Sequence, residues 1–428
     1  DELVKLATER LGGIEGVTEL SKHYEGIVVA KVVSCIKHPN ADKLSLCKVD
    51  DGGVVKDVAR DEDGFVQVVC GAPNVREGLL VAWIPPSAVV PSSYGDKELF
   101  VLEARDLRGE LSNGMLASPA ELGMSDDHSG ILEIDEEVKP GTPFKELYNL
   151  DDVILEIENK MFTHRPDCFG ILGVARELAG IQQLAFKSPE WYLEQPQFTA
   201  VNELPLEVSV EDQGLVPRFM AVAVKGINVQ SSPAWLQAGL TRVGIRPINN
   251  VVDITNYIMH LTGQPMHAYD YDKLKACSGE KPMLIARQAK TGEKLKLLSG
   301  KLMEFETPTI MIATDKQPVG VGGVMGGADT EVDDTTTSIV LECATFDMYS
   351  IRRTAMKYGL FTDAVTRFNK GQSPLQNDRA LIYALQLLQT HAGGQQASEV
   401  KDVHGDLPQP NIVQVSARFI NDQPPCVI

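Results

Sequence analysis

The sequence predicts an α+β protein of several domains, in which a small β-barrel precedes a mixed α/β region. Three observations lead to this expectation. The chain has 428 residues and 43% apolar content, enough for several hydrophobic cores. Its first third contains short runs of β-branched residues separated by turn-forming residues. From about residue 200, strand-like and helix-like patterns alternate.

The first expected element is one helix over residues 1–22, because Leu3, Leu6, Ala7 and Leu11 recur near helical spacing. Short strands follow, divided by turn signals such as HPNAD and DDGG. The expected strands span residues 27–36, 43–50, 64–72, 78–84 and 114–118. A compact series of this kind is typical of a small closed barrel of the OB type.

The remainder of the chain mixes both kinds of element. Further strands are expected at residues 153–159, 206–210, 218–227, 283–289, 309–315 and 338–346. Helices are expected at residues 170–181, 233–244, 251–263 and 375–394. Residues 187–197 resemble a linker. Either Asn249 or Asn250 could cap the helix expected at residues 251–263.

A glycine-rich segment, GVGGVMGG at residues 320–327, has the look of a phosphate-binding loop. A Walker loop requires a lysine directly after its last glycine, whereas Ala328 and Asp329 follow here. A dinucleotide-binding fingerprint also fails, because Met325 occupies the place of its third glycine. We expect instead that a ligand or a backbone approaches these glycines closely, or that they form a tightly packed sheet with bulges.

The apolar run SIVLECATF contains one carboxylate, Glu342. Strand alternation places Glu342 on the face opposite Leu341 and Cys343. A carboxylate among apolar neighbours requires a partner or a ligand hydroxyl, unless it faces solvent. Other candidates in this region are His267, Arg246, Thr362 and Ala364, none of which is specific by itself.

The net charge of −19 argues against a polyanionic partner for the molecule as a whole. Two basic segments stand out against it, residues 27–49 and residues 350–371. The first contains Lys31, Lys37, Lys43 and Lys48 against Asp42, and the second Arg352, Arg353, Lys357, Arg367 and Lys370 against Asp363. These segments could contact RNA phosphates, or they could be solvated charged faces.

The seven cysteines are scattered and never spaced as CxxC, which argues against a disulfide framework and a thiolate zinc site. A reducing cytoplasm is the expected setting. The sequence shows no apolar run long enough for a membrane span and no secretory signal. It starts without Met, so we expect a processed or cut chain.

Longer motifs resemble two known families. Residues 26–50, 68–78 and 107–123 are similar to the tRNA-binding OB domain shared by several synthetases. The motifs THRPDCFGILGVARELAG, GIRPINNVVDITNYIMHLTGQPMHAYD, GGVMGGADTEV, VLECATF and GLFTDAVTRFNKG resemble the bacterial phenylalanyl-tRNA synthetase β subunit. The resemblance runs in order over nearly the whole chain.

This resemblance implies a division of labour between subunits of an α2β2 assembly. The α subunit activates phenylalanine with ATP and Mg²⁺, and the β subunit binds tRNA(Phe) and hydrolyses mischarged Tyr-tRNA(Phe). We expect no cofactor and no metal ion in this chain, which lacks the family's later domains and should not aminoacylate alone. Two alternatives are a non-catalytic tRNA-binding or scaffolding module and a free RNA chaperone, which leaves most of the chain unexplained.

The resemblance also implies domains and site residues. The domains would be a discontinuous α/β domain at 1–25 and 145–195, an OB domain at 26–144, an editing domain at 196–396, and the start of a truncated domain at 397–428. The editing pocket would comprise Glu342 and His267 on the tyrosine hydroxyl, Gly326 against the ligand, Thr362 and Ala364 as the wall, and Arg246 on the terminal adenosine. The RNA-binding residues would be Lys31, Lys37, Lys43, Lys48, Arg76 and Arg108. Hydrolysis would use a positioned water, assisted by a ribose hydroxyl of the tRNA.

Overall fold

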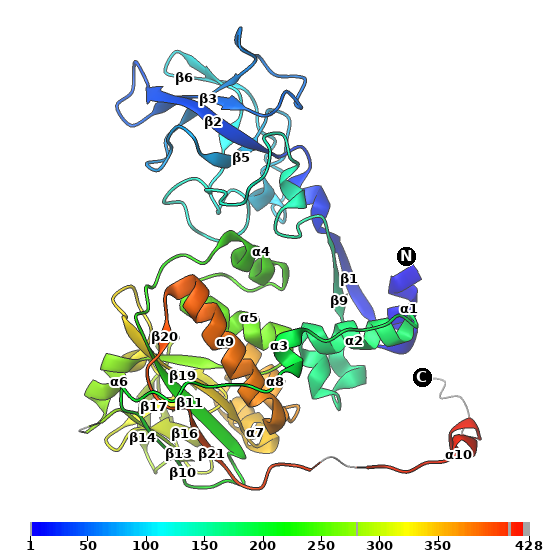
Figure 1. Cartoon of the computed structure of the whole chain (residues 1–428), viewed down its shortest axis with the longest axis vertical. Coiled ribbons are helices and arrows are strands. Elements are labelled where there is room, and N and C mark those ends of the chain that lie inside the picture. Colours follow the sequence, from blue (N-terminus) through cyan, green and yellow to red (C-terminus); the bar gives the residue numbers. More distant parts are fainter. Residues whose placement is uncertain (1, 280, 410–411, 423–428) are drawn as a thin grey trace. The chain divides into compact units, whose positions relative to one another are not determined.

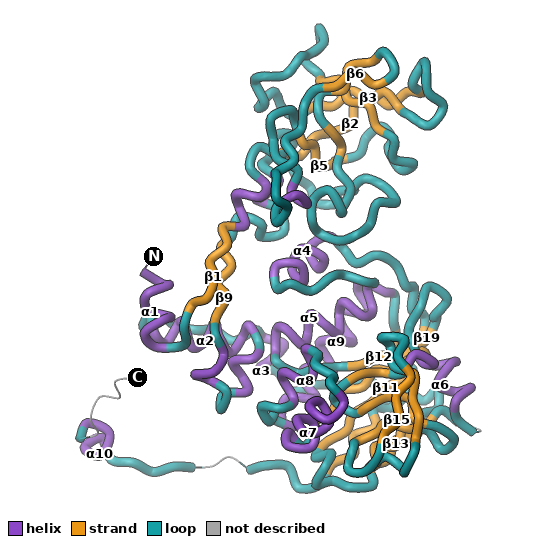
Figure 2. Tube along the Cα trace, turned by 180° about the vertical axis from the view of Figure 1, so that it is seen from behind, coloured by secondary structure: helices purple, strands orange, loops and turns teal. Residues whose placement is uncertain are grey.

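The computed structural model describes residues 2–279, 281–409 and 412–422, which form two compact units (Figures 1 and 2). Unit 1 comprises Asp1–Ile14, Ile157–Ser231 and Asn249–Ile428. Unit 2 comprises Glu15–Glu156 and Ser232–Ile248. Neither unit is a continuous segment, and the residues expected to form a separate discontinuous domain are shared between the two.

The single helix expected over residues 1–22 is wrong. Helix α1 (Glu2–Arg10) ends early, and strand β1 (Ile14–Glu19) and the 3-10 helix η1 (Leu20–Tyr24) follow it. Two glycines separate the helix from the strand, and a Cβ atom on Gly12 would lie 2.6 Å from the carbonyl oxygen of Glu158. Strand β1 pairs with β9 (Val153–Ile157), so a partner distant in sequence overrides the helical pattern.

Unit 2 contains a five-stranded sheet in the order β4-β3-β2-β5-β8. Its strands are β2 (Val28–Lys37), β3 (Ser45–Asp50), β4 (Val66–Cys70), β5 (Leu80–Ile84) and β8 (Met115–Leu116). Alternate side chains such as Val32, Val49 and Val68 fill the core around Trp83. The expected OB-type barrel and the α+β fold class are therefore confirmed. The hairpin of β6 (Arg105–Leu107) and β7 (Glu110–Ser112) was not predicted.

Helix α4 (Ala234–Arg242) belongs to unit 2 although it lies far along the sequence from the barrel. Its residue Ala238 is 1% exposed and packs in the same core as Leu122 and Met124. The hydroxyl of Thr241 donates a hydrogen bond of 2.9 Å to the carbonyl oxygen of Met124. Residues 232–248 are thus an integral part of the core of unit 2.

The described residues of unit 1 form two larger sheets and a small one. The first has the order β12-β19-β11-β20, with β21 also pairing with β11, and the second has the order β10-β13-β16-β17-β18. The strands of the first are β11 (Arg218–Lys225), β12 (His267–Asp270), β19 (Ser338–Thr345), β20 (Gln395–Gln396) and β21 (Lys401–His404). Those of the second are β10 (Glu207–Val210), β13 (Met283–Gln288), β16 (Ile310–Ala313), β17 (Pro318–Val321) and β18 (Met325–Gly326). The third pairs β14 (Glu293–Lys296) with β15 (Leu302–Phe305). Their shared core includes Phe219, Phe305, Met311 and Val340.

Helices α5 (Asn250–Thr262) and α9 (Asn377–Ala392) lie side by side over the sheet that contains β19 (Figure 1). Asn249 is the cap of α5, because its side-chain oxygen accepts hydrogen bonds of 3.1 and 2.9 Å from the amides of Val251 and Val252. The remaining helices of unit 1 are α2 (Ile171–Ile181), α3 (Glu190–Leu193), α6 (Tyr271–Cys277), α7 (Met348–Tyr358), α8 (Asp363–Phe368) and α10 (Ala417–Asn421). Helix α3 lies within the expected linker, and its Trp191 stacks on Tyr383 of α9 with 4.1 Å between ring centroids.

The segment expected to start a further domain contributes β21 to the first sheet of unit 1, where Lys401–His404 pairs with β11. The assignment of its remainder stays a prediction, and residues 410–411 and 423–428 lie outside the described residues. Within the described part of the chain, no helix is both long and apolar enough to cross a membrane.

Candidate functional site

Unit 1 contains a cavity of about 80 Å³, lined by strands of its two larger sheets and by helix α8. Its lining includes four of the six residues expected to form the pocket, namely His267, Gly326, Glu342 and Ala364. The walls are otherwise formed mainly by the glycine-rich segment and by apolar side chains. Thr362 lies beside the cavity, because its hydroxyl donates a 2.9 Å hydrogen bond to the carbonyl oxygen of Val324.

Glu342 and His267 face each other across neighbouring strands. They are direct partners in the antiparallel pairing of β12 with β19, a relation that places side chains on the same face of a sheet. The sequence placed His267 in a loop, which is wrong, because the strand exists only through its pairing with β19.

Glu342 is 6% exposed, and its carboxyl group has a partner inside the protein. The hydroxyl of Tyr269 donates a hydrogen bond of 2.5 Å to its Oε2 atom. Burial raises the pKa of Glu342 to about 7, although the bond from Tyr269 works in the opposite direction. Within the described chain, Oε1 accepts no hydrogen bond, so it is available to a ligand.

The importance of Tyr269 was not predicted from the sequence. It lies two residues after His267, so strand alternation would have placed it on the same face had residues 267–270 been recognised as a strand. The rings of His267 and Tyr269 pack edge to face with 4.4 Å between their centroids. The three side chains of Tyr269, Glu342 and His267 therefore form one contiguous polar group in an apolar wall.

Burial lowers the pKa of His267 to about 4, so its imidazole is neutral at physiological pH. The ring has no hydrogen-bond partner among the residues that the structure describes. A neutral imidazole presents one donor and one acceptor nitrogen. It can therefore interact with a hydroxyl group in either direction.

The glycine-rich segment forms strands β17 and β18 and the turn between them. A Cβ atom on Gly326 would lie 2.5 Å from Cε1 of His267, so the ring fits only against bare backbone. A Cβ atom on Gly322 would lie 2.8 Å from Ile310, and the pairing of β16 with β17 contains a register shift. The tightly packed, bulged sheet is therefore confirmed, whereas the neighbour of Gly326 is a side chain and the expected close approach of a ligand stays a prediction.

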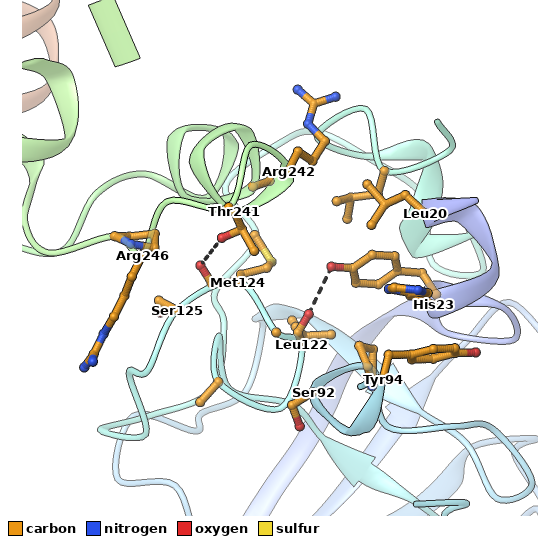
Figure 3. Close-up of a pocket in the computed structure, with 18 of the residues that line it drawn as sticks. Leu20, His23, Ser92, Tyr94, Leu122, Met124, Ser125, Thr241, Arg242 and Arg246 are labelled. Atoms are coloured by element: carbon orange, nitrogen blue, oxygen red, sulfur yellow. Dashed lines mark hydrogen bonds between the residues drawn. The ribbon is translucent and has the colours of Figure 1, made fainter. Parts of the chain in front are cut away.

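Arg246 lies in unit 2 and not with the other candidate residues of unit 1. Its exposed side chain forms an ion pair with Asp126 and lines a different cavity, of about 530 Å³ (Figure 3). In that cavity the hydroxyl of Tyr24 donates to the carbonyl oxygen of Leu122 at 3.0 Å. The expected contact of Arg246 with a terminal adenosine stays a prediction.

The six expected RNA-binding residues all have exposed side chains in unit 2. Two of them are neutralised: Lys48 pairs with Asp61 at 2.7 Å, and Arg76 makes two bonds of 2.8 Å to Glu133. The others are Lys31, Lys37, Lys43 and Arg108. Their role in RNA binding stays a prediction.

Comparison with known proteins gives two family matches. Residues 27–143 match a putative tRNA binding domain, and residues 215–393 match a B3/4 domain. The phenylalanine–tRNA ligase β subunit of Dickeya dadantii is 40% identical over 397 residues, covering 92% of this chain and 46% of the relative. Those of Pectobacterium atrosepticum and Yersinia pestis are each 39% identical, covering 95% and 91% of this chain and 48% and 46% of the relatives. The resemblance to this β subunit is therefore confirmed, and the chain spans about half the length of these relatives.

Proposed function

Because the chain is related in sequence to the β subunit of phenylalanine–tRNA ligase, we propose that it binds tRNA(Phe) and hydrolyses mischarged Tyr-tRNA(Phe). Phenylalanylation would be the work of an α subunit, using ATP and Mg²⁺, in an α2β2 assembly in the cytoplasm. The observation that carries the proposal is the buried Glu342 carboxyl group, which lies beside a neutral His267 at the wall of a small cavity.

The chemistry of these two groups suits a phenol. With a pKa of about 7, Glu342 is present in both protonation states at neutral pH, so it can accept a hydrogen bond from a phenol or donate one to it. His267 offers the complementary donor or acceptor. The side chain of phenylalanine has no oxygen to meet these groups and would leave Oε1 of Glu342 and the imidazole of His267 without a partner.

A second site is physically necessary because a pocket that reads a phenyl ring rejects an added hydroxyl only weakly, by roughly 100-fold. A site built to hydrogen-bond a hydroxyl can discriminate by roughly 10⁴-fold or more. A selective hydrolytic site that favours tyrosine would therefore correct the errors of the first. It would spare Phe-tRNA(Phe).

Among the described residues, the cavity lining includes no serine, threonine, cysteine or lysine, and the side chains of Glu342 and His267 are assigned to the phenol. We therefore assign hydrolysis to a positioned water, assisted by a ribose hydroxyl of the tRNA, and not to a covalent intermediate. The glycine-rich wall would let the ester approach the backbone, while Ala364 leaves space for the ring.

A second candidate is a tRNA-binding module with an idle pocket. The bond from Tyr269 favours it, because an internal phenol already satisfies one oxygen of Glu342. This alternative predicts binding of tRNA(Phe) without release of tyrosine.

The test is deacylation of Tyr-tRNA(Phe) and Phe-tRNA(Phe) by the full chain. We expect selective release of tyrosine, and a loss of roughly 100-fold or more on Glu342→Ala, as for removal of a buried polar recognition group. Glu304→Gln, which alters an exposed carboxylate in the same unit, should be without effect. Binding without release would support the module, and unchanged deacylation by Glu342→Ala would remove Glu342 from the site.

A further inference from the structure

Helix α7 carries an exposed surface that the proposed hydrolysis does not use. Tyr349, Arg352, Arg353 and Met356 are spaced i, i+3, i+4 and i+7, so they share one face of the helix. Tyr349 is 63% and Met356 66% exposed. Phe361, in the loop between α7 and α8, is 76% exposed. We call these five residues the α7 surface.

The opposite face of α7 is fixed in the core of unit 1. Ile351 and Ala355 are 1% and 2% exposed and pack in the same core as Phe368 of α8. The carboxylate of Asp347 caps the helix by accepting a 2.8 Å hydrogen bond from the amide of Ser350. Helices α7 and α8 pack side by side (Figures 1 and 2). The α7 surface is thus presented by a well-anchored helix.

The positive charges of the α7 surface lack acidic partners. Arg352 forms no ion pair with any described residue, and Arg353 donates only to the hydroxyl of Ser350, at 3.1 Å. Lys370, which follows α8 and is not one of the five residues of the α7 surface, donates to the hydroxyl of Thr163 at 2.9 Å, and its Nζ atom lies 4.9 Å from the centroid of the Phe169 ring. Burial and the nearby charge of Arg352 lower the pKa of Lys370. Arg352 and Arg353, which are adjacent in sequence, therefore present two positive charges with no acidic partner among the described residues, in a chain whose net charge is −19.

The acidic residues around this surface are already engaged. Asp363 pairs with Arg367 at 3.1 Å, Glu306 pairs with Lys357, and Asp347 holds the helix cap. A bound phosphate would supply the counter-charge that the surrounding protein does not.

The α7 surface also adjoins the cavity. Phe361 immediately precedes Thr362, which caps α8, and α8 contributes Ala364 to the cavity wall. On the inner side of α7, a Cβ atom on Gly323 of the cavity wall would lie 2.8 Å from the side chain of Ile351. Gly323 thus lines the cavity and packs against the buried face of α7, and the α7 surface lies on the opposite face of that helix.

We propose that the α7 surface binds the single-stranded 3′ end of the tRNA whose aminoacyl ester enters the cavity. Exposed aromatic rings stack unpaired bases, and arginine and lysine contact the phosphates between them. Arg352 and Lys370 would hold phosphate, and Tyr349 and Phe361 would stack bases. The inference rests on the proposed function for the identity of its ligand.

The first test compares a full with a minimal substrate. For Tyr-tRNA(Phe), Arg352→Glu and Phe361→Ala should each raise KM roughly tenfold and leave kcat unchanged. For a tyrosyl ester of adenosine alone, which lacks the other nucleotides, both variants should match the wild type. Lys275→Glu, the same charge reversal on α6 of unit 1, should change neither. An unchanged KM for Tyr-tRNA(Phe) in both variants would overturn the proposal.

A second test does not depend on hydrolysis, and it separates failure of this inference from failure of the proposed function. The full chain is titrated with an uncharged acceptor-stem hairpin, with or without its single-stranded 3′ nucleotides. The overhang should strengthen binding to the wild type roughly tenfold and have no effect on binding to Arg352→Glu. Equal effects of the overhang on both proteins would refute the inference. So would weaker association of Arg352→Glu with an α subunit at unchanged RNA affinity, which would identify a protein interface.

Discussion

Replacing Glu342 with glutamine should reveal the cost of the buried carboxyl group in unit 1. Its ordinary pKa is 4.5 and its pKa in the folded chain is about 7, so the folded state binds the proton more tightly. The corresponding stability is fully present below about pH 4.5 and is lost as the pH rises through about 7. At 1.36 kcal/mol per pKa unit, the loss amounts to about 3 kcal/mol.

Glutamine cannot ionise, and its amide oxygen can still accept the hydrogen bond from Tyr269. Other titrating groups contribute equally to both proteins. The free energy of unfolding of Glu342→Gln minus that of the wild type should therefore increase by about 3 kcal/mol between about pH 4.5 and about pH 8.

Urea denaturation at several pH values measures this difference. Trp191 stacks on Tyr383 within unit 1, so its fluorescence reports on that unit once Trp83 and Trp235 of unit 2 are replaced with phenylalanine. Glu304→Gln in the same background is the control, because it removes an exposed carboxylate from the same unit. If the difference for Glu342→Gln changed with pH no more than that of the control, the folded carboxyl group would titrate normally, and the argument from burial would be wrong.

Three further substitutions test individual features. Gly326→Ala would place a Cβ atom 2.5 Å from the ring of His267, so we expect deacylation of Tyr-tRNA(Phe) to fall at least about tenfold, and an unchanged rate would show that the ring can move freely. Asn249→Ala removes the cap of α5 and should destabilise unit 1 by about 1 kcal/mol in urea denaturation, whereas no change would mean that water replaces the cap. Arg60→Ala removes bonds of 2.7 and 2.9 Å from the fully buried Asp51 carboxylate and should destabilise unit 2 by about 3 kcal/mol at neutral pH. That loss should shrink in acid, because the bonds from Arg60 and backbone amides hold the pKa of Asp51 below 3.8 despite burial, and a loss independent of pH would contradict the assignment.

Local sequence patterns were sufficient to predict helices and strands that are determined by residues close to them in the sequence. The barrel strands follow runs of β-branched residues bounded by turns, and α5 has its own cap at Asn249. Elements that exist through distant pairing were missed. Residues 14–19 are a strand because β9 lies alongside, and residues 267–270 are a strand because β19 does. In both cases the partner strand lies too far along the sequence to be included when only neighbouring residues are considered.

The candidate site was likewise predicted only in part from the sequence. The apolar run around Glu342 indicated that the carboxylate needs a partner, but the register of β12 against β19, which supplies Tyr269, is a property of the tertiary fold. The family resemblance predicted Arg246 as a pocket residue. It gave no indication that the segment containing Arg246 folds into unit 2. Sequence motifs indicate which residues correspond to those of a known site, whereas the tertiary structure determines which residues lie next to them.

The membership of α4 in unit 2 bears on how the protein can be dissected in the laboratory. A recombinant peptide spanning 15–156 would contain every strand of the barrel and yet lack Ala238, which completes the packing around Leu122 and Met124. Such a peptide would expose a hydrophobic patch to solvent and tend to self-associate. A soluble version would require α4 to be grafted back through a designed connector.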